Sequence, residues 1–87
     1  MSFQNIFSHR IKQLRKDKGF NQIQFAKELD VPRQTVGSWE NGFRIPALET
    51  LCELAVYFNV TLDYLTGFDY LSGNRADEEA ITLEKAI

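Results

Sequence analysis

Two short helical segments with only three residues at their junction constrain the fold of this 87-residue chain more than any other feature. The first segment is predicted over residues 22–29 and the second over residues 32–41. They are joined through Asp30, Val31 and Pro32, of which Pro32 is also the first residue of the second segment. Proline fits the first position of a helix, because the N–H group that proline lacks would have no partner there. Two short helices joined in this way form a helix-turn-helix unit when they cross near a right angle. The sequence therefore predicts one such unit in its first half.

Helical periodicity continues on both sides of this unit, and no segment shows the alternation of a β-strand. Before the unit, Phe7, Ile11 and Leu14 recur at the three- and four-residue spacing of one apolar helix stripe. The three further predicted helices span residues 5–18, 47–58 and 62–66. The predicted fold class is therefore all-α, a compact five-helix bundle.

Capping residues mark the ends of the predicted helices. Asn21 and Gln24 have the spacing of a capping box at the start of the second helix, and Phe20 and Phe25 have the spacing of a hydrophobic staple. Thr61 is placed to cap the last helix. Glycine, which readily adopts a left-handed conformation, follows three of the helices, at residues 19, 42 and 67.

Cysteine and histidine are too few to predict a metal or cofactor site. Cys52 is the single cysteine, so no intramolecular disulfide can form, and His9 stands alone as an expected exposed residue. Cys52 is predicted to be a small buried hydrophobe. The side chains expected to face inward from the fourth helix are Leu48, Leu51, Cys52, Ala55 and Phe58. No apolar run approaches the roughly 18 residues that cross a bilayer, so a cytoplasmic protein without a membrane partner is expected.

The net charge of −2 hides an asymmetry between the two halves of the chain. Residues 1–46 contain eight basic and four acidic residues, a charge of +4, whereas residues 47–87 contain two basic and eight acidic residues, a charge of −6. The first half can therefore attract a polyanion that the second half repels. The charge of the whole chain is the wrong quantity for judging an anionic partner.

The helix predicted over residues 32–41 carries polar side chains that fit the edges of bases. Val36, Trp39 and Glu40 share one side of this helix, and the polar residues share the other. Arginine can form two hydrogen bonds with guanine, glutamine can form two with adenine, and serine can contact either base. The polar side consists of Arg33, Gln34, Gly37, Ser38 and Asn41. The alternative reading of Arg33 and Gln34 is a solvated helix start.

The segment FNQIQFAKELDVPRQTVGSWENGFRIPALETLCELAVYFNVTLDYLTG resembles the Cro/repressor-type helix-turn-helix family, also called the Xre family. With the preceding helix included, the resemblance covers about residues 5–67. It implies a five-helix bundle of the lambda-repressor-like DNA-binding type, in which the second and third helices form the helix-turn-helix. It also implies operator DNA as the partner and a symmetric homodimer as the binding species.

The resemblance implies roles for individual residues. Gln22, at the start of the second helix, is expected to hold a phosphate with its side chain and backbone N–H. Arg15 and Glu40 match a pair that forms an ion bridge between the first and third helices; the alternative is two unrelated surface charges. The expected base contacts are Arg33, Gln34, Gly37 and Ser38. The expected contacts to the DNA backbone are Gln22, Thr35, Asn41, Phe43 and Arg44.

Three positions depart from the family pattern. Asp30 stands where glycine is usual in the turn, and aspartate tolerates the left-handed region better than most residues. Gly37 stands where a longer side chain is common, which weakens the case for direct readout at this position. Ala47 stands where serine often caps the fourth helix, so a cap worth about 1 kcal/mol is expected to be missing.

The chain is predicted to divide into a DNA-binding domain, residues 1–68, and an acidic segment, residues 69–87, with a linker near residues 71–74. Within the second part, apolar residues recur at a heptad-like spacing, which predicts a dimerisation helix, with a frayed tail as the alternative. The fifth helix is the other candidate interface. The candidate interface residues are Leu62, Tyr64, Phe68, Ala80, Leu83 and Ile87.

The predicted function is sequence-specific binding of double-stranded DNA and transcriptional regulation, most simply repression at a palindromic operator read in the major groove. The alternatives are an antitoxin or a restriction–modification controller that uses the same domain, or a protein-interaction module that has lost DNA binding. An enzyme is not predicted, because the chain lacks a nucleophile–base set, metal-ligand spacing and a glycine-rich phosphate loop. No cofactor or small-molecule ligand is expected.

Overall fold

The computed structural model describes residues 3–72, and these residues form six helices and no strand. The all-α prediction is confirmed for this part of the chain, and the predicted helix ends differ from the observed ones by about one or two residues. In chain order the helices are α1 (Phe3–Asp17), α2 (Gln22–Leu29), α3 (Arg33–Glu40), α4 (Leu48–Phe58), α5 (Leu62–Thr66) and α6 (Phe68–Leu71).

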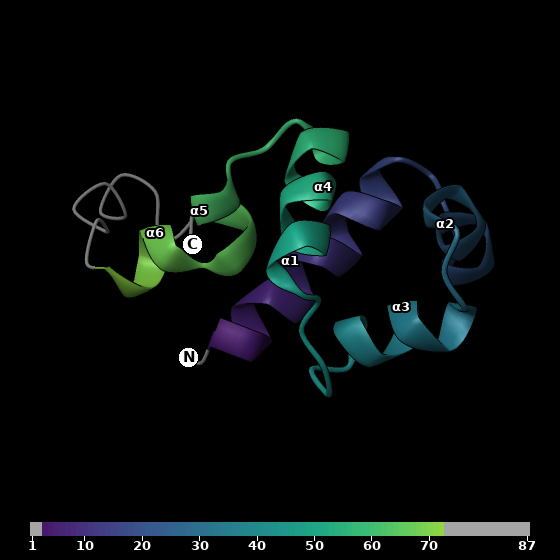
Figure 1. Cartoon of the computed structure of the whole chain (residues 1–87), viewed down its shortest axis with the longest axis horizontal. Helices are drawn as coiled ribbons and strands as arrows, with labels where there is room; N and C mark the ends of the chain where they lie inside the picture. The colour runs from purple at the N-terminus through teal and green to yellow at the C-terminus, as the bar shows by residue number, and fades with distance from the viewer. Residues whose placement is uncertain (1–2, 73–87) are drawn as a thin grey trace.

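α1 and α4 occupy the middle of the molecule, with α2 and α3 on one side and α5 and α6 on the other (Figure 1). α1 contacts both α3 and α5, and α4 also contacts α5. The apolar stripe predicted for α1 is confirmed, because Phe7 and Ile11 are fully buried and Leu14 packs against the core. The other side chains that are less than 2% exposed are Phe25, Val36, Leu54 and Leu65.

The ends of α2 have the predicted caps. The Asn21 side chain accepts a hydrogen bond from the Gln24 N–H at 2.7 Å, and the Gln24 side chain accepts one from the Asn21 N–H at 2.8 Å. The Phe20 and Phe25 rings stack with their centroids 6.4 Å apart, as the staple spacing predicted. Asp30 ends α2 in the left-handed conformation with φ of 59°, so the turn forms without glycine. Pro32 is the N-cap of α3 rather than its first residue, because α3 begins at Arg33.

Two of the residues predicted to face inward from α4 are exposed. Leu48 is 67% exposed and Cys52 is also exposed, whereas Leu54, absent from the prediction, is 1% exposed. Leu48 and Cys52 lie four residues apart on one side of α4, and the core-facing stripe follows the other side at positions 51, 54, 55 and 58. The predicted loss of the N-cap is confirmed, since Ala47 makes no side-chain capping bond.

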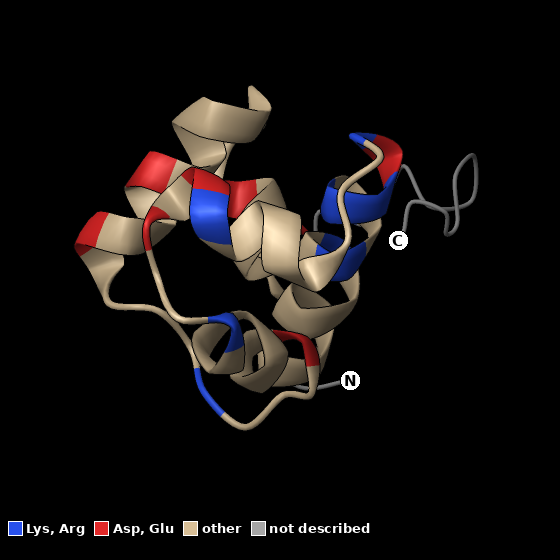
Figure 2. Cartoon of the chain, turned by 90° about the vertical axis from the view of Figure 1, so that its right-hand side faces the viewer, with Lys and Arg blue, Asp and Glu red and all other residues tan. Residues whose placement is uncertain are grey.

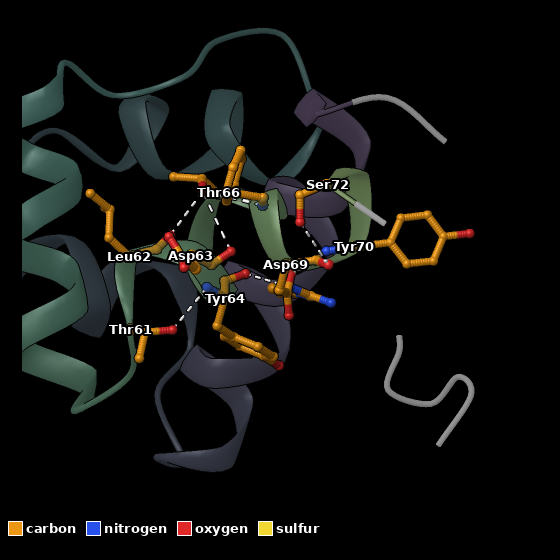
Figure 3. A network of polar contacts seen from close by, with 10 residues as sticks. Thr61, Leu62, Asp63, Tyr64, Thr66, Asp69, Tyr70 and Ser72 are labelled. Carbon is orange, nitrogen blue, oxygen red and sulfur yellow. Dashed lines mark hydrogen bonds and ion pairs between the residues drawn. The ribbon is translucent and has the colours of Figure 1, made fainter. Parts of the chain in front are cut away.

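The short helix α6 was not predicted, and an ion pair joins it to α1. The Asp69 carboxylate accepts from Arg10 Nη1 at 2.9 Å, and Arg10 also donates to the Tyr64 carbonyl and lies 4.2 Å above the Tyr64 ring. Figure 3 shows the polar contacts of this end, including the Thr66 hydroxyl, which donates to the Leu62 carbonyl at 2.8 Å. The first residues of the predicted 69–87 segment therefore pack on the globular part, and the predicted linker overlaps α6.

The candidate tail residues Ala80, Leu83 and Ile87, together with the predicted tail helix, lie outside the described residues. Of the other candidate interface residues, Phe68 is 56% exposed, while Leu62 and Tyr64 are partly buried. None of the helices described in residues 3–72 is long and apolar enough to span a membrane.

Candidate nucleic-acid interface

α3 has one side in the core and one side open to solvent. Val36 is fully buried and Trp39 is 4% exposed. Arg33 and Gln34 are exposed in the first turn of α3. The burial of Val36 and Trp39 sets the rotation of α3 about its own axis. The predicted division of this helix into two sides is confirmed.

The exposed side of α3 continues into the loop that follows it. Gly42 turns the chain with φ of 78°, and the Ser38 carbonyl accepts from the Phe43 N–H at 2.9 Å and from the Arg44 N–H at 3.3 Å. These two bonds tie the start of the loop back to α3. Phe43 is 75% exposed, an unusual setting for a large aromatic side chain. Figure 2 shows basic segments at the start of α3 and in this loop.

A surface groove separates α3 from the start of α4. Gln34, Thr35 and Ser38 line it from α3, and Arg44 lines it from the loop. Thr50 of α4 lines the same groove and was not among the predicted site residues. Local periodicity gave no signal for Thr50, because its place beside α3 depends on how the loop returns the chain. The groove brings polar side chains from three consecutive segments to one edge of the helix-turn-helix.

Arg15, Glu40 and Gln22 form a polar cluster that joins the first three helices. Arg15 donates from Nε to Glu40 Oε2 at 2.6 Å and from Nη2 to Glu40 Oε1 at 3.0 Å, so the ion pair is bidentate. The side chains of Arg15 and Glu40 are 8% and 2% exposed, which rules out two unrelated surface charges. Arg15 Nη1 also donates to the Phe20 carbonyl at 2.7 Å. Gln22 Nε2 donates to Glu40 Oε1 at 3.0 Å.

The first turn of α2 presents unpaired backbone donors. The N–H groups of Gln22 and Ile23 have no acceptor among residues 3–72, as is usual for the first positions of a helix. The Asn21 side chain satisfies the next N–H group, that of Gln24. A helix N-terminus with open N–H groups is chemically suited to an anion such as phosphate. No metal-binding group of three or more His, Cys, Asp or Glu side chains occurs among the described residues.

Gly37 lies within α3 without a structural need for glycine. A Cβ atom at this position would meet nothing within 4 Å. Gly37→Ala should therefore raise the free energy of unfolding by about 1 kcal/mol, the usual advantage of alanine over glycine inside a helix. Thermal melts followed by circular dichroism would measure this gain. The family resemblance implies that position 37 lies close to DNA, and on that expectation the added methyl group should weaken DNA binding. Unchanged binding would show that the glycine is incidental.

The comparisons with known proteins agree with this geometry. The Helix-turn-helix family model matches residues 11–65. The chain is similar to the HTH-type transcriptional activator BcrR of Enterococcus faecalis, with 39% identity over 77 residues that cover 88% of this chain and 33% of BcrR. It is also similar to the HTH-type transcriptional regulator ImmR of Bacillus subtilis, with 33% identity over 79 residues, 90% of this chain and 62% of ImmR.

A phage-related relative extends the set. The cryptic phage CTXphi transcriptional repressor RstR of Vibrio cholerae is 33% identical over 57 residues, which cover 66% of this chain and 51% of RstR. The chain thus spans between 33% and 62% of the length of these three relatives. Because the family match includes α2, the turn and α3 together with their supporting helices, the chain belongs to the Xre-type helix-turn-helix family.

Proposed function

We propose that this chain is a transcriptional regulator that binds double-stranded DNA and reads its sequence with α3 in the major groove. The observation that supports the proposal is the two-sided environment of α3. The apolar side of α3 is buried in the core, while Arg33 and Gln34 are exposed at its N-terminal end. This is the end that contacts base edges in helix-turn-helix proteins. Three relatives are named as transcriptional regulators, among them one activator and one repressor.

The proposed contacts divide into base readout and backbone positioning. Arg33, Gln34 and Ser38 read bases, with Gly37 permitting close approach. The Gln22 side chain and the open N–H groups of α2 bind a phosphate. Further backbone contacts come from Thr35, Asn41, Phe43 and Arg44. We propose repression as the direction of regulation, as the name of the phage-related relative RstR, a transcriptional repressor, suggests.

Selection of bound sites from a random duplex library tests the proposed function. We expect enrichment of a defined sequence. Affinity for the selected duplex should fall as salt rises, with a slope near −0.9 in log K against log salt for each phosphate neutralised. A protein-interaction module that has lost DNA binding would enrich no sequence and would show no such dependence. The acidic isoelectric point of the chain is compatible with DNA binding, because only the exposed side of α3 and the loop after it need to face the duplex.

The two kinds of contact should respond differently to substitution. Arg33→Ala should cost about 1–3 kcal/mol of binding free energy on the selected duplex and relax the preference at one base pair. Gln22→Ala should weaken selected and random duplexes by the same factor, because a phosphate carries no sequence information. Fluorescence anisotropy on both duplexes measures these effects. A changed sequence preference in Gln22→Ala, with none in Arg33→Ala, would refute the assigned register of α2 and α3 on DNA.

We further propose that the chain binds a palindromic operator as a homodimer. A two-fold axis would place the two α3 helices about 34 Å apart, which is one turn of DNA. Deletion of residues 75–87 should weaken dimerisation, seen by sedimentation as a lower association constant. Circular dichroism should still report a folded core. If dimerisation were unchanged, the interface would lie instead at α5 and α6, where Phe68 is exposed.

A further inference from the structure

Glu40 accepts hydrogen bonds from two other helices at once. Its Oε1 atom accepts hydrogen bonds from Arg15 Nη2 and from Gln22 Nε2, each at 3.0 Å. Its Oε2 atom accepts one from Arg15 Nε at 2.6 Å. An ion bridge between α1 and α3 accounts for the Arg15 contacts. It does not account for the third contact, in which the last residue of α3 holds the side chain of the first residue of α2.

The chemistry of the carboxylate sets the orientation of the Gln22 amide. An ionised glutamate accepts hydrogen bonds and cannot donate them, whereas a glutamine side chain has a donor NH2 group and an acceptor oxygen. The Glu40 carboxylate is paired with the Arg15 guanidinium, with Arg15 Nε 2.6 Å from Glu40 Oε2. Only the NH2 group of Gln22 can therefore face Glu40. One of its two N–H bonds is used in that contact, and the second remains for another acceptor.

The position of this contact matters for the helix-turn-helix as a whole. The turn at residues 30–32 joins the C-terminal end of α2 to the N-terminal end of α3. The Gln22–Glu40 contact joins the two opposite ends of the same helices, which the backbone does not connect. Figure 1 shows α1 passing beside this pair, and α1 supplies the Arg15 that anchors Glu40.

We propose that Glu40 is a positioning residue for DNA binding, which holds the Gln22 amide so that its second N–H and the open N–H groups of the α2 first turn converge on one phosphate. Glu40 itself does not touch DNA, because its side chain is 2% exposed. The inference rests on the proposed function and adds the cause of the Gln22 orientation. It predicts that Glu40 contributes to affinity only through Gln22.

A double-mutant cycle on DNA affinity tests this dependence. The variants are Gln22→Met, Glu40→Gln and the double variant, measured by fluorescence anisotropy on the selected duplex and on a random-sequence duplex of equal length. A glutamine at position 40 can either donate or accept, so it no longer dictates one amide orientation. Each single variant should weaken binding to both duplexes by about three- to tenfold. The double variant should bind DNA no more weakly than the weaker-binding of the two single variants. If instead its loss of affinity equals the product of the two single losses, the proposal is overturned.

Loss of stability must be separated from loss of positioning. Circular dichroism fixes a temperature at which every variant is fully helical. If Glu40→Gln does not fold, the paired variant Arg15→Met with Glu40→Met removes both charges and provides a second background. Gln22→Met should then cause no further loss of affinity in that background. A further loss equal to that seen in the wild-type background would overturn the proposal.

A second ion pair between α1 and another helix provides the control. Asp69→Asn removes the Arg10–Asp69 pair, which also joins α1 to another helix but lies on the side away from α2 and α3. This variant should melt at a lower temperature and keep wild-type affinity while folded. Equal weakening by Asp69→Asn and Glu40→Gln would assign the effect of Glu40 to stability and overturn the positioning role.

One readout does not need DNA. The two side-chain N–H resonances of Gln22 in a 15N correlation spectrum should move in Glu40→Gln and stay in place in Asp69→Asn. Unmoved Gln22 resonances in Glu40→Gln would contradict the proposed contact. A wild-type chain that enriched no duplex would overturn the proposed function, and the inference with it, whereas multiplying losses in the cycle would overturn the positioning role alone.

Discussion

Glu40→Gln should lower the free energy of unfolding by about 3–5 kcal/mol, the usual cost of removing one partner from a buried ion pair. Arg15 would keep its charge at a site that is 7% exposed, with the Phe20 carbonyl and a neutral amide oxygen at position 40 as its remaining acceptors. The loss is a large fraction of the stability of a small domain, which is about 5–15 kcal/mol. Urea unfolding followed by circular dichroism measures the loss as a change in midpoint at constant slope.

The paired variant Arg15→Met with Glu40→Met identifies the source of this loss. Replacing both members of a buried pair by apolar residues of similar volume is often neutral or stabilising. We therefore expect the double variant to recover most of the stability lost in Glu40→Gln. A double variant as unstable as the single one would mean that the geometry of the ion pair, and not an uncompensated charge, maintains the packing of α1 on α3.

Gly67→Ala should destabilise the domain by about 2–6 kcal/mol, because two separate costs add at this residue. Its φ of 82° lies in the left-handed region, which costs a residue with a side chain about 1–3 kcal/mol. A Cβ atom would also lie 2.6 Å from Cγ2 of Ile6. Ile6 is 3% exposed and has little room to move, so overpacking adds about 1–3 kcal/mol. Thermal and urea unfolding would both report the loss.

Gly19→Ala is the matched control for Gly67→Ala. Gly19 has a similar φ of 80°, but a Cβ atom there would meet nothing within 4 Å. Gly19→Ala should therefore show the backbone cost alone, and the difference between the two variants measures the overpacking against Ile6. Equal losses at the two positions would contradict a steric role for Ile6 at the junction of α5 and α6.

The helices that sequence reasoning placed well are those with local signals. The capping box of Asn21 and Gln24 and the cap at Thr61 join residues three positions apart, so their spacing could be read directly. The turn at Asp30 also formed as expected, because aspartate tolerates a left-handed conformation. Each of these features depends on backbone geometry within one turn of helix, and neighbouring residues are enough to specify it.

The errors occurred where distant residues decide the outcome. α6 contains only four residues and is joined to α1 by Arg10 and Asp69, which are 59 positions apart in the sequence. Cys52 was predicted to be buried from its chemical type, but the side of α4 that faces the core is chosen by the packing of the other helices. A helix with apolar residues on more than one side does not by itself specify which side is covered.

The sequence by itself determined the all-α class, the helix-turn-helix and the polar side of α3, because these follow from the helical period and from capping chemistry within a few residues. Only the tertiary structure decided that Glu40 accepts hydrogen bonds from Arg15 and Gln22 together and that Thr50 lies in the groove beside α3. The reason is physical: these contacts join separate helices, and their distances depend on how the side chains of the core pack.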